Sequence, residues 1–229
     1  MTCTTVMFAN AKGGTGKSTI AFLSALHYAA TRNARVCVVD FDRLRTTYNA
    51  LRRFADSGVK SFYLADEYGE GHKVSPEAVR SALDGCRADS DTLFVDTPSG
   101  FPAGTMVPAI APGLIFVPVS VSDADIIATR AYLPELEDAA ARVTELTGFW
   151  PQIVVVPNQV FSEDDAKRIR DIFRDRSIQI ASTLAFSRVL RDVFHFEPGD
   201  TNIASVFRDD GDFFQWMSSE IFALQKQTR

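Results

Sequence analysis

The chain has 229 residues, 46% of them hydrophobic and 23% charged, and a formal net charge of −5. This balance excludes a disordered or low-complexity protein and predicts one globular domain over residues 1–229. No stretch approaches the ~20 apolar residues that a membrane span requires. The residues before the first motif lack a secretory signal, so we expect a cytoplasmic protein. The acidic balance argues mildly against a protein wrapped in nucleic acid.

Short runs rich in Val, Ile and Phe recur along the chain and alternate with amphipathic segments. Continuous apolar runs are typical of parallel strands that are covered on both faces. The runs span residues 4–10, 35–42, 92–98, 113–121 and 152–158. The alternation predicts a doubly wound, mostly parallel α/β sheet flanked by helices, with ligands at the carboxyl ends of the strands.

Helix signals lie between these runs. A helix is predicted over 17–31, and Ser75 precedes a proline at a predicted first helical position. Ser122 and Ser162 each have an acid three residues later, as in a weak capping box. Pro134 falls inside the long predicted helix 122–147, where we expect it to kink or split the helix.

A glycine-rich segment follows the first predicted strand and opens the first predicted helix. Residues 11–18 nearly match the phosphate-binding pattern GxxxxGK[ST], with Ala11 in place of the first glycine. Backbone N–H groups of such a loop surround phosphate oxygens, and the helix N-terminus attracts negative charge. Lys17 is predicted to contact the β- and γ-phosphates and the Ser18 hydroxyl to bind Mg²⁺. The nucleotide-binding residues predicted here are Gly13, Gly14, Thr15, Gly16, Lys17, Ser18 and Thr19.

The segment "KGGTGKST" (12–19) resembles the deviant Walker A motif of the ParA/MinD-type ATPases. The resemblance covers nearly the whole chain and implies a Mg²⁺-dependent ATPase that is monomeric alone and a homodimer with ATP. The early lysine of the motif, here Lys12, then reaches the nucleotide of the partner subunit. A cation supplied in this way stabilises the charge that develops on the γ-phosphoryl group. Lys12, Lys17 and Asp42 are the catalytic residues that the resemblance implies.

Further motifs of the same family match at the ends of later strands. "VVDFD" (38–42) resembles its second motif, which implies that Asp40 lies near Mg²⁺ and that Asp42 positions the attacking water. "FVDTPSG" (94–100) resembles its Walker B segment, which implies that Asp96 holds Mg²⁺ through water. "VVVPNQV" (154–160) resembles the strand whose terminal Asn, here Asn158, binds adenine. The chain departs from the partition proteins in one place: Arg43-Leu44-Arg45 stands where they usually have Pro-Gln.

A nucleotide-dependent switch of this kind has three candidate outputs, that is, three kinds of target on which the ATP-bound dimer acts. In the first, which the resemblance to short ParA-like proteins favours, the ATP dimer binds non-specific DNA on the nucleoid and positions a DNA or protein cargo. A partner protein, which the sequence does not identify, then stimulates hydrolysis. The candidate DNA contacts are Arg188 and Arg191, with Arg168, Arg170 and Arg174 nearby in the sequence. The alternative is that these arginines pair with neighbouring aspartates at the surface.

The second output is membrane cycling of the MinD kind, which requires an amphipathic C-terminal helix with a basic polar face. Phe214, Met217, Ile221 and Leu224 do form an apolar stripe, but few basic residues accompany it. We therefore expect this helix to pack on the core. The third output is cluster chemistry as in the nitrogenase iron protein. Cys3, Cys37 and Cys86 lack suitable spacing, so we expect them to be small buried hydrophobic residues.

Overall fold

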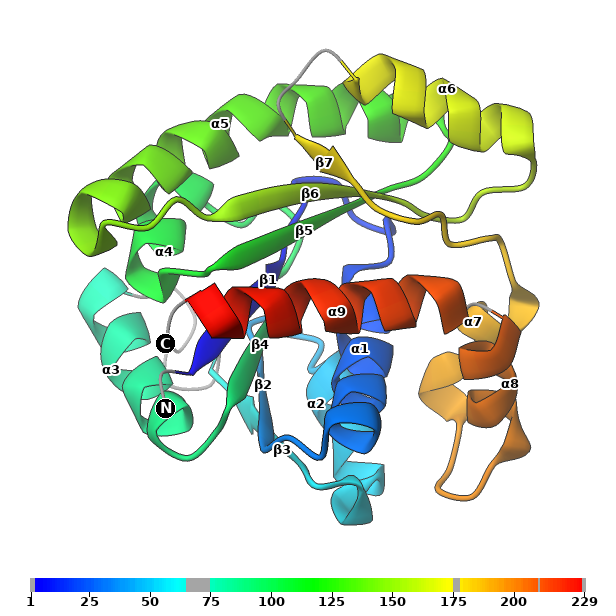
Figure 1. The fold of residues 1–229 in the computed structure, drawn as a ribbon, viewed down its shortest axis with the longest axis horizontal. Helices are drawn as coiled ribbons and strands as arrows, with labels where there is room; N and C mark the ends of the chain where they lie inside the picture. Colours follow the sequence, from blue (N-terminus) through cyan, green and yellow to red (C-terminus); the bar gives the residue numbers. More distant parts are fainter. Residues whose placement is uncertain (1–2, 65–74, 175–177, 210, 228–229) are drawn as a thin grey trace.

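The computed structural model describes residues 3–64, 75–174, 178–209 and 211–227, and their strands form one seven-stranded sheet (Figure 1). The strand order is β3-β2-β4-β1-β5-β6-β7, and every neighbouring pair is parallel. The strands are β1 (Thr4–Phe8), β2 (Val36–Asp40), β3 (Val59–Tyr63), β4 (Thr92–Asp96), β5 (Leu114–Val119), β6 (Gln152–Pro157) and β7 (Gln179–Ile180). The predicted fold class is confirmed.

Helices cover both faces of the sheet (Figure 1). One layer comprises α1 (Lys17–Arg32), α2 (Thr46–Arg53), α7 (Arg188–Arg191), α8 (Thr201–Asp209) and α9 (Gly211–Gln227), with the short turns η1 (Ala55–Ser57) and η3 (Val193–His195). The other comprises α3 (Pro76–Ala88), α4 (Ala103–Ile110), α5 (Asp123–Thr147) and α6 (Glu163–Phe173). Residues of β1 alternate between the two cores, because successive side chains of a strand point to opposite faces.

The predicted helix starts are confirmed at three serines. The side chains of Ser75, Ser122 and Ser162 each accept a hydrogen bond from the backbone N–H three residues later. Pro134 does not split its helix, since α5 runs without a break over 25 residues. The adjoining Leu133 and Leu136 are fully buried, so their packing keeps the helix continuous despite the hydrogen bond that proline removes.

The topology places three strand ends side by side. Asp96 at the end of β4 is paired in register with Phe8 at the end of β1 and with Asp40 at the end of β2. The segments that follow these strands therefore meet at one edge of the sheet. This edge carries the glycine-rich loop and the predicted acidic residues, as expected for a doubly wound sheet.

Candidate nucleotide-binding site

The loop between β1 and α1 depends on two glycines with left-handed backbone. Gly14 has φ 81° and Gly16 has φ 97°, conformations that side-chain-bearing residues rarely adopt. Gly16 also lies against β6, because a Cβ atom there would be 2.2 Å from Nδ2 of Asn158. The first helical hydrogen bond of α1 runs from the N–H of Ile20 to the carbonyl of Gly16. The loop thus ends directly on the positive end of the helix dipole.

Two amides at the end of β6 hold this loop. The buried Asn158 donates from Nδ2 to the carbonyl of Thr15 at 2.8 Å, and Gln159 donates from Nε2 to the carbonyl of Gly14 at 2.9 Å. The sequence singled out Asn158 as an adenine ligand but did not predict this contact with the loop, and it did not single out Gln159 at all. The backbone of Gln159 itself has a left-handed φ of 56°.

The two lysines of the loop have different environments. Lys17 is buried, and its ammonium donates to the carbonyl of Lys12 at 3.1 Å. Burial lowers the pKa of Lys17, while Asp96 and Asp42 act in the opposite direction. Lys12 has an exposed side chain that forms no ion pair with any residue the structure describes, and Asn10 Oδ1 accepts from its backbone N–H at 3.1 Å. One lysine therefore faces its own loop and the other faces solvent.

Asp96 lies beneath the loop and is fully buried. Its Oδ2 accepts a 2.6 Å hydrogen bond from the Thr47 hydroxyl of α2. Burial, and then the neighbouring carboxylate of Asp40, raise the pKa of Asp96 to about 7, although Thr47, Ser18 and Lys17 counteract the rise. Thr47 was not predicted as a site residue, because a threonine in the first turn of a helix has no distinguishing sequence signal.

Asp40 and Asp42 differ in what their carboxylates contact. Asp40 is buried and accepts from the backbone N–H groups of Asp42 at 2.8 Å and Tyr48 at 3.0 Å, so it anchors the start of α2. Burial raises the pKa of Asp40, and these hydrogen bonds oppose the rise. Asp42 is only partly buried, and its Oδ1 accepts from the N–H of Leu44 at 3.0 Å.

A cavity of about 380 Å³ opens above the loop. Its lining includes seven of the predicted residues, namely Gly13, Gly14, Gly16, Lys17, Ser18, Thr19 and Asp42, together with Leu44, Thr46, Ser99, Gln159 and Phe194. Asn158 instead lines a smaller adjoining cavity of about 70 Å³, with Gly16, Thr19, Phe186 and Arg191 among its neighbours. The fold therefore gathers the loop, Asp42 and Asn158 around one continuous region, with Asp40 and Asp96 behind it.

The polar groups behind the loop fit a magnesium ion. Oδ1 of Asp96 is buried and has no hydrogen-bond partner among the described residues, which is unfavourable for a carboxylate oxygen. Mg²⁺ is usually held by one or two protein ligands plus phosphates and waters, so this carboxylate oxygen is a suitable ligand for it.

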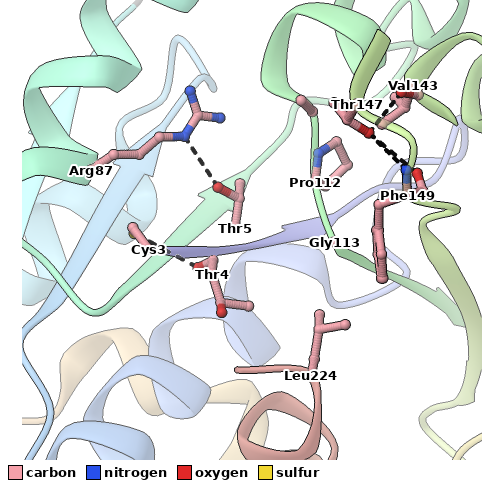
Figure 2. A pocket seen from close by; sticks show the side chains of 11 residues that line it. Cys3, Thr4, Thr5, Arg87, Pro112, Gly113, Val143, Thr147, Phe149 and Leu224 are labelled. Atoms are coloured by element: carbon pink, nitrogen blue, oxygen red, sulfur yellow. Dashed lines mark hydrogen bonds between the residues drawn. The ribbon is translucent and has the colours of Figure 1, made fainter. Parts of the chain in front are cut away.

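A second cavity, of about 360 Å³, lies at the opposite edge of the sheet (Figure 2). It is lined by Cys3, Thr5 and Gly113 among others, next to the starts of β1 and β5. Arg87 is the charged residue in this lining, and it already donates to the hydroxyl of Thr5 and to the carbonyl of Ile110. This cavity contains none of the predicted site residues.

The candidate DNA-contacting arginines fall into two groups, according to whether they form ion pairs with described residues. Arg168, Arg170 and Arg174 pair with Asp123, Glu163 and Asp171, respectively. Arg188 and Arg191 on α7 are exposed, and neither pairs with an acidic group of the described residues. Surface pairing therefore accounts for the first three arginines and leaves the α7 pair available.

The fold and the loop together define a P-loop nucleotide-binding protein. Over residues 6–195 the chain matches the model of the CobQ/CobB/MinD/ParA nucleotide binding domain. No curated protein sequence is significantly similar to the chain. The match covers most of the chain, so the protein belongs to the CobQ/CobB/MinD/ParA family.

Three solved structures are similar in fold. Apo McdA from Cyanothece superposes with a TM-score of 0.69 at 17% identity, covering 96% of this chain and 99% of that one. A putative plasmid partition protein from Borrelia burgdorferi, bound to AMPPNP, gives 0.65 at 14% identity over 99% and 100% of the chains. MinD from Pyrococcus horikoshii, complexed with Mg-ADP, gives 0.61 at 14% identity over 96% of each chain. The ligands of the last two are consistent with the predicted cofactors, ATP and Mg²⁺.

Helices of the described part of the chain are either too short or too polar to cross a bilayer. The apolar stripe of α9 is buried: Phe214, Met217, Ile221 and Leu224 are at most 2% exposed. Helix α9 packs on α1 and β1, and hydrogen bonds join His27 to Ser218 and Tyr28 to Gln225. The prediction that this helix packs on the core is confirmed.

Proposed function

We propose that the protein is a Mg²⁺-dependent ATPase that dimerises with ATP and, as the dimer, holds non-specific DNA in order to position a cargo. Its nucleotide-binding site is the cavity above the loop. Lys17 leaves the carbonyl of Lys12 to contact the β- and γ-phosphates, and backbone N–H groups of residues 13–19 surround their oxygens. Ser18 and, through water, Asp96 would hold Mg²⁺, which would offset the negative charge of the phosphates.

The observation that carries this proposal is the contrast between the two lysines. Lys17 supplies the cation for the protein's own site, whereas Lys12 is exposed, makes no ion pair among the described residues, and extends from the same loop. An unpaired cation beside a triphosphate site has a natural partner in the nucleotide of a second subunit. It would stabilise the transition state as an arginine finger does.

Hydrolysis itself requires a group that orients water. Asp42 lines the cavity, is partly exposed and retains oxygens beyond the one that accepts from Leu44. Asp40 is less suited to this task, because both of its oxygens accept backbone hydrogen bonds. We therefore assign the water-positioning role to Asp42 and give Asp40 the role of anchoring the segment that carries Asp42.

The output is proposed to be binding of DNA phosphates by Arg188 and Arg191. Both are exposed on α7, and Arg191 also lines the small cavity beside Asn158, the proposed adenine ligand. Because Arg191 lies beside the proposed adenine site, a bound nucleotide would affect the surface that contacts DNA. The protein would act in the cytoplasm on the nucleoid, with a partner protein stimulating hydrolysis. Membrane cycling is disfavoured, because the apolar stripe that it requires is buried against α1 and the sheet.

The test uses Asp42→Ala protein, which should bind ATP, hydrolyse it slowly and accumulate as the dimer. Binding to a labelled random-sequence duplex is measured with ATP and with ADP over a range of salt concentrations. We expect binding with ATP only, and it should weaken steeply with salt, since each phosphate contact contributes about −0.9 to the slope of log K against log[salt].

A matched pair of variants assigns the contacts. Arg188→Gln/Arg191→Gln in the Asp42→Ala background should lower the salt slope by about 2 if both arginines contact phosphates. Arg168→Gln/Arg174→Gln removes the same charge from arginines that are ion-paired, and should change the slope little. An ATP dimer that binds no DNA at low salt would refute the proposed output while leaving the ATPase assignment in place.

A further inference from the structure

A fully buried asparagine lies between β1 and the glycine-rich loop. The side chain of this residue, Asn10, forms three hydrogen bonds. Its Nδ2 donates to the carbonyl of Pro118 on β5 and to the hydroxyl of Thr129 on α5, both at 2.8 Å. Its Oδ1 accepts from the backbone N–H of Lys12 at 3.1 Å. One side chain therefore joins the loop to a strand and a helix whose contacting residues lie 108 and 119 positions further along the chain.

The three contacts require an amide at this position. Two acceptors need N–H donors and one N–H needs an acceptor, and a neutral amide supplies both kinds of group. A carboxylate would be a buried charge facing the carbonyl of Pro118, and a leucine would leave that carbonyl without its donor. An asparagine that bonds the N–H two residues later is common by itself. Here, however, the amide is also fixed on the sheet and on α5, so it ties the loop to the core.

The hydrogen bond from Lys12 to Asn10 holds one side of a planar peptide unit. The N–H of Lys12 and the carbonyl of Ala11 belong to the same plane. That carbonyl accepts from the backbone N–H of Gly100, in the segment after β4, at 3.0 Å. Both polar groups of the unit are therefore bound. This restricts the Cα of Lys12 and so the direction in which its exposed side chain leaves the loop.

We propose that Asn10 is a positioning residue, which directs the side chain of Lys12 toward the nucleotide of the partner subunit. The carbonyl of Lys12 accepts from the ammonium of Lys17, but phosphates would take that ammonium away. The bond to Asn10 is out of reach of the phosphates, because Asn10 is buried, so it would hold Lys12 in the ATP-bound state as well. This inference rests on the proposed function, in which Lys12 acts across the dimer. A side chain directed beforehand lowers the entropy cost of pairing.

The test uses the Asp42→Ala protein, whose ATP dimer should persist, and adds Asn10→Ala, Thr129→Val or Lys12→Ala. Thr129→Val is the matched control, because it removes one hydrogen bond of the same network but leaves those from Asn10 to Pro118 and to Lys12 in place. ATP affinity is measured by equilibrium dialysis and the dissociation constant of the ATP dimer by analytical ultracentrifugation. Urea unfolding establishes that each variant is folded.

We expect Asn10→Ala to raise the dissociation constant of the dimer about tenfold, because backbone freedom of one residue is then lost on pairing rather than on folding. ATP affinity should change by less than about threefold, since the residues that contact phosphates are intact. Thr129→Val should also change the dimer constant by less than about threefold. Combined with Lys12→Ala, the Asn10→Ala change should have almost no further effect, because no side chain is left to position.

Equal weakening of the dimer by Asn10→Ala and Thr129→Val would overturn the proposal, since a general loss of stability would then explain both. Additive effects of Asn10→Ala and Lys12→Ala would overturn it as well. A Lys12→Ala dimer as stable as its parent would refute the proposed function together with this inference. A weakened Lys12→Ala dimer beside an unchanged Asn10→Ala dimer would refute this inference alone.

A second measurement does not depend on the folding of any Asn10 variant. In the Asp42→Ala protein, exchange of the Lys12 N–H with deuterium is followed by NMR without nucleotide and with ATP. We expect slow exchange in both states, because the bond to the buried Asn10 oxygen protects this N–H. Exchange with ATP as fast as in an unfolded peptide would show that Asn10 has released Lys12, and would overturn the proposal.

Discussion

Gly16→Ala should be one of the most damaging single-methyl changes in the glycine-rich loop. A non-glycine residue in the left-handed region costs about 1–2 kcal/mol. The new Cβ would also be 2.2 Å from Nδ2 of Asn158, so the amide must move and break its 2.8 Å hydrogen bond to the carbonyl of Thr15. A buried polar group without a partner costs about 1–3 kcal/mol more. We expect the free energy of unfolding without nucleotide to fall by about 2–5 kcal/mol in total.

Gly14→Ala is the matched control. Gly14 has φ 81°, also left-handed, but a Cβ there would meet nothing within 4 Å. Urea unfolding should show a loss of only about 1–2 kcal/mol, the backbone contribution alone. In an Asn158→Ala background the two glycine changes should cost the same within about 0.5 kcal/mol, as expected for a double-mutant cycle that removes the shared contact. Equal losses in the wild-type background would refute the argument that Asn158 packs against Gly16.

The remaining predictions concern four other residues. Lys17→Ala should abolish ATP binding in equilibrium dialysis, and tight binding by this variant would count against the P-loop assignment. Lys12→Ala should retain ATP binding but weaken the ATP dimer in analytical ultracentrifugation, and a dimer of normal stability would return Lys12 to the role of a solvated lysine. Thr47→Val should lower the free energy of unfolding by about 1–3 kcal/mol by leaving Asp96 Oδ2 without its donor, whereas Thr47→Ser should not. Burial lowers the pKa of His27, so the unfolded chain binds the proton more readily; stability should fall as pH drops below about 6.5, with a slope of up to about 1.4 kcal/mol per pH unit that His27→Gln removes.

The strands and the loop were predictable from the sequence because buried parallel strands leave a continuous apolar signal. The runs around β1, β2, β4, β5 and β6 all form strands, and the glycine-rich loop follows β1 as predicted. The edge strand β3 was not predicted. Its residues alternate between buried and exposed over only five positions, so its pattern resembles that of a loop. The two-residue strand β7 is shorter than any periodicity can reveal.

The sequence located the region of the candidate site but not its contacts. The glycine-rich pattern indicated the loop and the family resemblance implied three aspartates, which the fold brings near the loop. Neither could indicate that Asp40 anchors α2 or that Thr47 donates to Asp96. Those contacts depend on where α2 returns to the sheet, a tertiary property. In the same way, Arg168 and Arg170 form ion pairs whereas Arg188 and Arg191 do not within the described residues. These ion pairs join residues on different turns or elements, so no local sequence pattern reveals which arginines are paired.

The hydrogen bond from Lys17 to the carbonyl of Lys12 has a consequence for the order of events. Under the proposed function, the ammonium of Lys17 leaves that carbonyl only when phosphates offer a better acceptor. Its departure leaves the Lys12 carbonyl, part of the backbone of the residue proposed to reach the other subunit, without its donor. Occupancy of one subunit's own cavity would therefore alter the loop that presents Lys12 to a partner, so that nucleotide binding precedes dimerisation. In two empty copies the Lys12 side chains are exposed but the backbone that positions them is still held by Lys17, and this difference would give the cycle a direction.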